Sequence, residues 1–428
     1  MEIREFKSMD ERVYFERLDN GMQVYMMPKP GFNKTYATFT TRYGSIDNEF
    51  VPLGTSDAKH VPDGIAHFLE HKLFEKEDHD VFEKFSEKGA STNAFTSFTR
   101  TCYLFSATSE LENNLVTLLD FVQSPYFTEE TVEKEKGIIE EEIKMYDDNA
   151  DFKSYFGVLN NMYHNHPIKI DIAGTVESIA DITAEMLHEC YNTFYHPSNM
   201  ILFVVGDFDP NELIKVVHAN QNAKDYSMAP EIKRFFPDEP KEVAVKESSV
   251  TMQVSSPKVL VGVKGDAYAG ATARDLLRDE MALEIIFEIL FGSSSTYHEE
   301  LLHSGLTNDS FSYEVSNEEH YSFCLVGGDT SKPEELTQSL IDKLLEIPNT
   351  KISEEEFTRI KRKKIGRFLA ALNSMEFIAN RFTDYAFSGL SLFDVTHVLE
   401  DLKCTDLETI AQSYFKEDRI TVFTIMPK

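Results

Sequence analysis

The stretches TEETV at residues 128–132 and SEEEF at residues 353–357 decide the fold of this 428-residue chain. Each begins with a hydroxyl residue that can cap a helix, continues with an acidic first turn, and opens a long helical pattern. The same device therefore stands once in each half of the chain. Strand-like and helix-like runs surround it in a similar order on both sides, so the sequence predicts two copies of one α/β unit.

The runs around these helices define the fold class and the domains. NMILFVVG at residues 199–206 predicts a central strand of the first copy, and VLVGV at 259–263 predicts one of the second. Residues 223–243 collect Pro, Lys, Asp and Glu without a period, as a linker does. We expect an α+β fold of two homologous α/β sandwich domains, each a mixed sheet with helices, at 1–222 and 244–428.

Composition excludes several classes of function. Forty-two Lys and Arg against 73 Asp and Glu give a net charge of −31, which argues against binding to nucleic acid or to an anionic membrane. The N-terminus has no apolar leader and no apolar run approaches the length of a membrane span, so we expect a cytoplasmic protein. Four dispersed cysteines without C-x-x-C spacing indicate reduced, buried thiols.

The stretch HFLEH at residues 67–71 carries the chemistry. On a helix, His67 and His71 are four residues apart and face the same side, where two imidazole nitrogens can bind one tetrahedral metal ion. Glu70 lies beside them and could take a proton from water without being a ligand. Chance alone gives such a motif in roughly one chain of this composition in 25, and a solvated helix face is the alternative interpretation.

A hydrolytic zinc site needs a third ligand, and the helix predicted at residues 128–147 offers several carboxylates. Glu135 and Glu142 fall on the apolar stripe of this helix, where a carboxylate is costly to bury unless it is paired or binds a cation. Glu142 is the best ligand candidate. Glu140 and Glu141 fit a solvated run of charges better.

HFLEH, followed by the helix with Glu142, resembles the inverted zincins of the pitrilysin family, to which insulin-degrading enzyme and mitochondrial processing peptidase belong. Asn93-Ala94 and His196-Pro197-Ser198-Asn199 also stand where that family has similar residues. Chain length and duplicated halves are similar to the short, processing-peptidase-like bacterial members. The resemblance covers the whole chain and implies a zinc-dependent endopeptidase acting on peptides.

The same resemblance implies roles for the site residues. His67, His71 and Glu142 would bind one Zn²⁺ per chain, and Glu70 would be the general base. Glu135 would match an accessory carboxylate that helps to hold the histidines or the water.

A substrate-binding strand is also implied. Residues 91–96 would match an edge strand that takes up a peptide by β-augmentation, with Asn93, Ala94 and Phe95 as substrate contacts. An edge strand without that role is the alternative.

The second half lacks the motif. Opposite the histidine motif lie Glu284, Phe287 and Glu288, and Arg367 falls opposite Glu142, where a guanidinium would repel a divalent cation. The second half is therefore not expected to bind zinc. The resemblance implies that it caps the first half and encloses a chamber.

The partner expected for this chain follows from a missing residue. In the family, an Arg and a Tyr of the non-catalytic half point at the substrate carbonyl, and the matching stretch at residues 311–321 has tyrosines but no arginine. We therefore expect a heterodimer with a homologue that lacks the zinc motif. The alternative function is a non-catalytic peptide-binding or structural subunit of such a heterodimer, and a zinc phosphoesterase is disfavoured because the acidic surface would repel phosphate.

Overall fold

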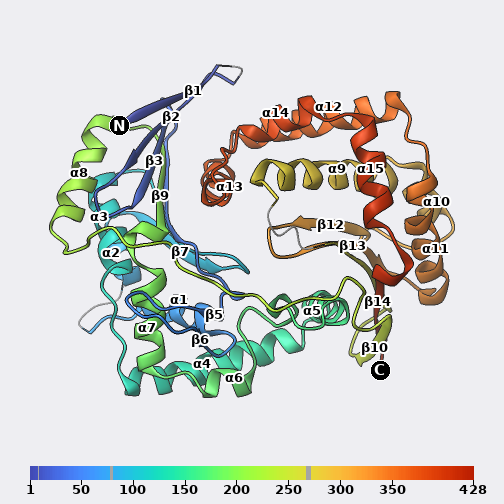
Figure 1. Cartoon of the computed structure of the whole chain (residues 1–428), viewed down its shortest axis with the longest axis horizontal. Helices are drawn as coiled ribbons and strands as arrows, with labels where there is room; N and C mark the ends of the chain where they lie inside the picture. The colour runs from blue at the N-terminus through green and yellow to red at the C-terminus, as the bar shows by residue number, and fades with distance from the viewer. Residues whose placement is uncertain (8, 78–80, 267–270) are drawn as a thin grey trace. The chain divides into compact units, whose positions relative to one another are not determined.

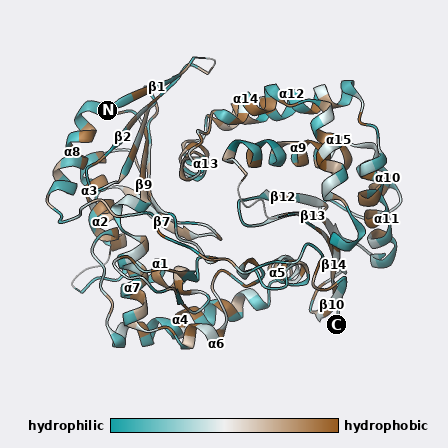
Figure 2. Cartoon of the chain, viewed as in Figure 1, coloured by the Kyte–Doolittle hydropathy of each residue, from teal (hydrophilic) through white to brown (hydrophobic). Residues whose placement is uncertain are grey.

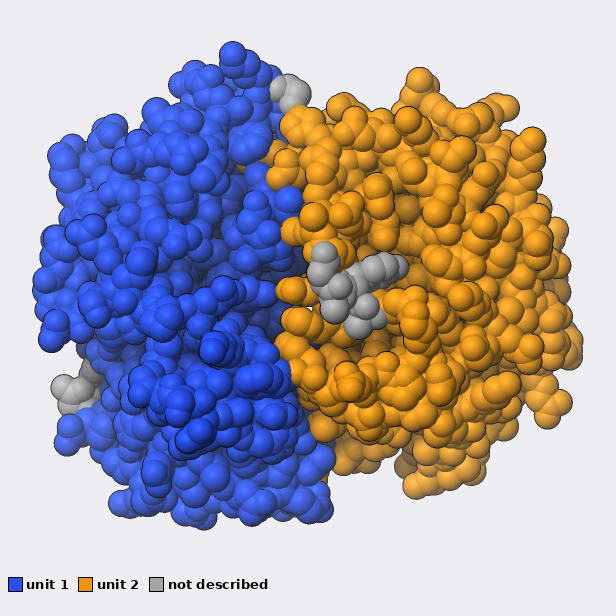
Figure 3. All heavy atoms as spheres, viewed as in Figure 1, with its two compact units in different colours: residues 1–143, 171–235, 371–392 blue, residues 144–170, 236–370, 393–428 orange. Residues whose placement is uncertain are grey.

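The computed structural model describes residues 1–7, 9–77, 81–266 and 271–428 (Figure 1). They form two compact units, coloured separately in Figure 3. Unit 1 consists of Met1–Ile143, Asp171–Phe235 and Ala371–Leu392, and unit 2 of Lys144–Ile170, Phe236–Ala370 and Phe393–Lys428.

Unit 1 is built on a seven-stranded sheet in the order β1-β2-β3-β9-β4-β8-β7. Strands β3 and β9 are parallel, and the other neighbours are antiparallel. All seven residues of β9 are buried, as expected for a continuous apolar run in the middle of a sheet. The strands are β1 (Glu2–Phe6), β2 (Glu11–Arg17), β3 (Gln23–Pro28), β4 (Thr35–Thr41), β7 (Ala90–Thr96), β8 (Thr101–Ala107) and β9 (Met200–Gly206), with a separate pair β5 (Glu49–Phe50) and β6 (Lys59–His60).

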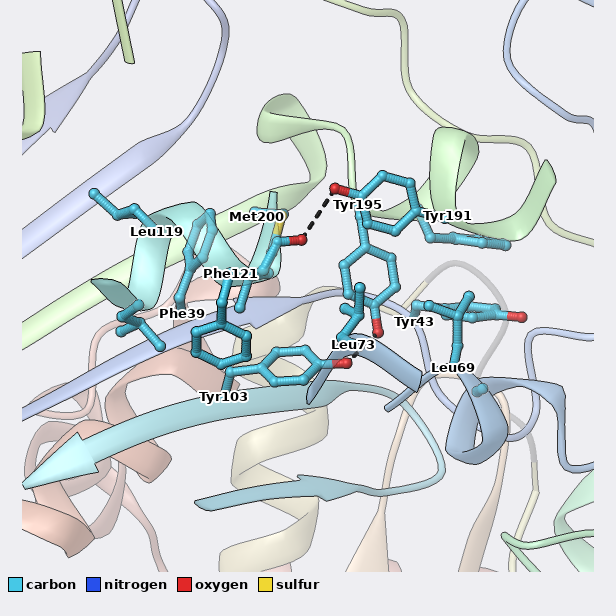
Figure 4. Close-up of a cluster of buried hydrophobic side chains, with 14 of the residues drawn as sticks. Phe39, Tyr43, Leu69, Leu73, Tyr103, Leu119, Phe121, Tyr191, Tyr195 and Met200 are labelled. Atoms are coloured by element: carbon cyan, nitrogen blue, oxygen red, sulfur yellow. Dashed lines mark hydrogen bonds between the residues drawn. The ribbon is translucent and has the colours of Figure 1, made fainter. Parts of the chain in front are cut away.

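The helices of unit 1 cover this sheet and bury its aromatic core. Figure 4 shows part of that core, in which the hydroxyls of Tyr103 and Tyr195 are 2.8 Å apart and satisfy each other. The helices that begin in unit 1 are α1 (Ile65–Phe74), α2 (Val81–Ser86), α3 (Leu111–Val122), α4 (Glu129–Asp147), α6 (Val176–Ala180), α7 (Ala184–Phe194), α8 (Pro210–Asn222) and α13 (Met375–Phe387), with the short turn η2 (Pro197–Asn199).

Unit 2 is built on a five-stranded sheet in the order β10-β14-β11-β13-β12. Its strands are β10 (Glu247–Met252), β11 (Lys258–Lys264), β12 (Ser312–Asn317), β13 (Ser322–Asp329) and β14 (Ile420–Pro427). Its helices are α5 (Ala150–Met162), α9 (Ala273–Phe291), α10 (Thr296–His303), α11 (Pro333–Glu346), α12 (Glu354–Ala371), α14 (Asp394–Asp401) and α15 (Cys404–Tyr414), with the short turns η1 (Pro167–Lys169), η3 (Ile347–Asn349) and η4 (Glu417–Arg419).

The two sheets are copies of one design. β10-β14-β11-β13-β12 repeats β3-β9-β4-β8-β7, with a parallel first pair and antiparallel pairs after it. The helices that the two acidic N-terminal signatures predicted are present as α4 and α12. The expected fold class, a duplicated α/β unit, is therefore confirmed.

Each compact unit includes one helix that chain order would assign to the other repeat. Helix α5 follows α4 in the chain but packs on β11 and β14, where the Asn161 amide donates to the Val422 carbonyl at 3.0 Å. Helix α13 follows α12 but packs on β4 and β9, where Phe382 lies 4.7 Å from Phe203. Each compact unit therefore contains one segment from the other half of the chain. The predicted domains, 1–222 and 244–428, follow chain order and remain a prediction about the two repeats.

The helices have hydrophilic and hydrophobic residues in alternation along their length, as the colours of Figure 2 show. No helix within the described residues is long and apolar enough to cross a membrane. The four cysteines are free and buried, as the sequence predicted.

Candidate metal centre

Helix α1 brings His67 and His71 together on one face. Their ring centroids are 4.5 Å apart, as the four-residue spacing predicts. The helix starts abruptly because Gly64 precedes it with φ 87°, in the left-handed region that favours glycine. A Cβ at Gly64 would lie 2.3 Å from the Ala173 carbonyl oxygen, so the close contact with this neighbouring loop also requires glycine.

Helix α4 supplies the third candidate ligand. One Glu142 oxygen lies 3.8 Å from His67 Nε2, and the other lies 3.5 Å from His71 Nε2. The ligand atoms of the three residues all lie within 4.8 Å of one another. No second group of three His, Cys, Asp or Glu side chains converges this closely in the part of the chain that the structure describes.

These separations fit a zinc ion. Ligands bound to one tetrahedral Zn²⁺ at roughly 2.0–2.1 Å lie roughly 3.3 Å from each other, which is close to both observed distances. The same distances are longer than those of ordinary hydrogen bonds, so direct pairing does not explain the arrangement. Burial and the neighbouring His71 lower the pKa of His67 to about 3, which keeps this imidazole neutral and able to coordinate.

Glu135, two helical turns before Glu142, lies behind the second histidine. Its Oε1 is 3.0 Å from His71 Nδ1, and only 12% of its side chain is exposed. Burial disfavours a charged His71, but the bond to Glu135 and the charges of Glu70 and Glu142 together raise its pKa. A proton held on Nδ1 by Glu135 leaves the Nε2 lone pair free for a metal ion.

Glu70 is buried beside the histidines on α1. Burial raises the pKa of Glu70, and the hydrogen bond from Thr96 and the charge of His71 oppose that rise. The Thr96 hydroxyl donates to Glu70 Oε2 at 2.6 Å. Sequence reasoning did not single out Thr96, because a hydroxyl near the end of a strand carries no motif; its place in the predicted 91–96 strand was the available signal.

Strand β7, which carries Thr96, is the outermost strand of its sheet and pairs with β8. Asn93 is exposed, while Ala94 and Phe95 are half-buried. The Arg100 guanidinium lies 5.9 Å from the Phe95 ring. The structure thus places all three predicted substrate contacts on an edge strand whose last residue touches Glu70.

The corresponding place in unit 2 holds an ion-pair network. Glu288 on α9, 4% exposed, pairs with Lys363 and, at 3.2 Å, with Arg367 on α12. The Tyr313 hydroxyl of strand β12 donates to the same carboxylate at 2.5 Å. Arg367, which the sequence aligned with Glu142, therefore faces the carboxylate that the sequence aligned with His71.

Two protein-family models match the chain. The one described as insulinase, peptidase family M16, covers residues 50–176, which include every residue of the candidate metal centre. The one described as the peptidase M16 inactive domain covers residues 181–364.

Curated relatives and a solved structure agree with these matches. The chain is 53% identical to the uncharacterized zinc protease YmfH of Bacillus subtilis over 424 residues, 99% of each chain. It is 26% identical to the zinc protease PqqE of Helicobacter pylori, covering 96% of this chain and 92% of the relative. The crystal structure of an M16-like peptidase from Alicyclobacillus acidocaldarius matches with a TM-score of 0.94 and 39% identity, over 98% and 99% of the chains.

Proposed function

The chain belongs to peptidase family M16, the insulinase family, and from this premise we propose that it is a zinc-dependent endopeptidase with one metal ion per chain. The observation that carries the proposal is the convergence of His67, His71 and Glu142 beside the buried Glu70. When bound by these three residues, zinc would supply Lewis acidity that polarises a peptide carbonyl and makes water more acidic.

Glu70 would move the protons of the reaction. Its carboxylate would accept a proton as water attacks the peptide carbonyl carbon, and it would deliver that proton to the leaving amine nitrogen as the C–N bond breaks. The pKa that burial raises suits a group that must hold a proton between these two steps. Thr96 would fix the carboxylate in position, and Glu135 would orient His71.

Strand β7 would present the substrate. A peptide added to its free edge as an extra strand would meet Asn93, Ala94 and Phe95, and would run along the strand that ends at Thr96. Main-chain hydrogen bonds bind peptides of many sequences, so this mode fits an endopeptidase without a narrow cleavage rule.

We further propose that full activity needs a partner subunit. No arginine occurs at residues 311–321, so a homologue without the zinc motif would contribute the arginine side chain that this chain lacks there. The four free cysteines agree with a reducing compartment, and we propose the cytoplasm. The competing function is a subunit that binds peptides without cleaving them.

Zinc content and peptide cleavage test the proposal together. We expect about one zinc per wild-type chain, and Glu70→Gln should retain it. The wild type should cleave a mixed peptide library, with or without the partner, and Glu70→Gln should abolish this cleavage. Glu141→Gln is the matched control, because it makes the same chemical change at the exposed neighbour of Glu142. A wild-type chain that binds no zinc would favour the non-catalytic subunit instead.

A further inference from the structure

Unit 2 contains a cavity of about 510 Å³ beside helix α5, outside the metal centre. Its walls come from α5 and from strands β11, β12 and β13. Gly327 and Gly328 on β13 line the cavity with backbone alone. A Cβ at Gly327 would lie 2.0 Å from the Val259 carbonyl oxygen, so this part of the wall cannot be filled by a simple substitution.

The charges around this cavity are unbalanced. Lys258 pairs with Asp151 at 2.8 Å and with Asp329 at 2.5 Å, so two carboxylates already share one ammonium. A third carboxylate, Glu314 on β12, accepts a hydrogen bond at 3.3 Å from the neutral hydroxyl of Tyr155. One cation against three carboxylates leaves a negative potential in the cavity, and a positively charged group is the ligand that it favours.

The exposure of Glu314 and an unpaired hydroxyl in the cavity wall also favour a polar ligand. Glu314 is exposed on the outermost strand of its sheet, so a ligand can reach its carboxylate from solvent. Ser154 of α5 lines the cavity and is 6% exposed, and its hydroxyl has no hydrogen-bond partner among the described residues. Buried hydroxyls normally have a partner, so the wall of the cavity contains an unsatisfied polar group.

We propose that this cavity is a second ligand site, which binds a guanidinium or ammonium group against Glu314. A guanidinium can donate two parallel hydrogen bonds to one carboxylate, which is the strongest pairing available to this side chain. The cation could belong to a basic side chain of a peptide or to a free amine. All residues that line this cavity belong to unit 2, and binding there is independent of peptide hydrolysis.

A charge-matched pair of probes tests it. N-acetyl-arginine amide and N-acetyl-citrulline amide have nearly the same shape, but only the first is charged. By calorimetric titration of the full chain at low salt, we expect the arginine probe to bind roughly tenfold tighter or more, as a charged hydrogen bond predicts. Equal binding of the two probes, or binding of neither, would overturn the proposal.

Variants locate the binding. Glu314→Gln should remove the preference for arginine, whereas Glu408→Gln, the same change at an exposed residue that does not line the cavity, should keep it. Ser312→Phe places bulk in the cavity from an exposed strand position and should weaken arginine binding while Glu314 remains. His71→Ala should bind arginine as wild type does, which separates this site from the metal centre. An arginine preference that survives Glu314→Gln would contradict the assignment.

A peptide arm distinguishes the two sources of the cation. A glycine-rich heptapeptide with a central arginine is compared with its citrulline counterpart. If the peptide binds more tightly than the acetylated amino acid and depends on Glu314, the cation is a basic side chain of a peptide. If the heptapeptide binds no more tightly than the acetylated amino acid, and n-butylamine binds with the same dependence on Glu314, the cavity recognises a free amine. Peptide binding without any dependence on Glu314 would overturn the proposal.

Discussion

The two units place different chemistry at the same point of a repeated scaffold. In unit 1, the ligand atoms of His67, His71 and Glu142 lie within 4.8 Å of one another, close enough to hold one metal ion. In unit 2, the equivalent helices bring a carboxylate, Glu288, directly against two cationic side chains. At the proposed metal centre the cation would come from solution, whereas unit 2 provides its own cations, Lys363 and Arg367.

The outermost strands extend this parallel. In unit 1, the Thr96 hydroxyl of β7 donates to a carboxylate on α1, and in unit 2, the Tyr313 hydroxyl of β12 donates to a carboxylate on α9. The scaffold thus provides a helix pair and a hydroxyl in both copies. If the proposed metal centre is correct, the two copies differ in the source of the positive charge, which is a metal ion in unit 1 and Lys363 with Arg367 in unit 2.

The largest effect should come from removing a metal ligand. His71→Ala deletes one of the three proposed ligands, and we expect loss of zinc and a fall in peptide cleavage of about a thousandfold, because metal catalysis contributes several kcal/mol. Atomic emission and cleavage assays measure both. Glu288→Ala at the equivalent position should keep the zinc, and a His71 variant with normal zinc content would contradict the assignment of His71 as a ligand.

The reverse experiment removes the internal carboxylate of unit 2. Glu288→Ala leaves Lys363 and Arg367 facing each other without a counter-charge. We expect a loss of about 2–3 kcal/mol in unfolding free energy, below the value for a fully buried pair because Arg367 is 62% exposed. Urea unfolding measures the change. Glu284→Ala, which removes a more exposed partner of Lys364, should cost less than about 1 kcal/mol.

Thr96→Val tests the hydroxyl that strand β7 contributes. The substitution keeps the shape of the side chain but removes the hydrogen bond to Glu70. We expect roughly tenfold slower turnover with zinc unchanged, since a bond to a charged group is worth about that much. Thr92→Val is the matched control on the same strand, because the Thr92 hydroxyl donates to the Leu104 carbonyl instead. Equal rates for both variants would remove Thr96 from its positioning role.

The smallest expected effect is on pH dependence. Although burial opposes it, the hydrogen bonds from Lys363 and Tyr313 and the two cations lower the pKa of Glu288. A lowered folded-state pKa adds stability above the unfolded value of about 4.3 and loses it as the pH falls through the folded value. The stability difference between wild type and Glu288→Gln should therefore shrink from pH 6 to pH 3.5 in urea titrations. A difference that grows on acidification would contradict this sign.

Local sequence patterns predicted most of the site. Two histidines on one helical face and a carboxylate on an apolar stripe are consequences of helix geometry, so His67, His71 and Glu142 could be singled out from spacing. Thr96 could not, because its contact with Glu70 depends on how a strand end packs against a helix. The repeat was visible because its helix starts share a capping signature.

The exchange of helices was not visible in the sequence. An amphipathic pattern shows that a helix buries one face, but it does not show which sheet receives it. Helices α5 and α13 have ordinary patterns and are preceded by capping residues, Asn149 and Ser374, that specify only where each helix starts. Their destinations depend on contacts far apart in the chain.

Because α13 belongs to unit 1 but lies late in the chain, unit 1 cannot complete its folding until much of the second half has been synthesised. The strands of the unit 1 sheet are complete once Gly206 has left the ribosome, but the helix that covers β4 and β9 ends at Phe387. Until then, the nascent chain exposes Phe203 and its neighbours, which are buried in the finished protein. We expect unit 1 to complete its folding only after Phe387 has been synthesised, and to offer an apolar surface to chaperones from the completion of β9 until then.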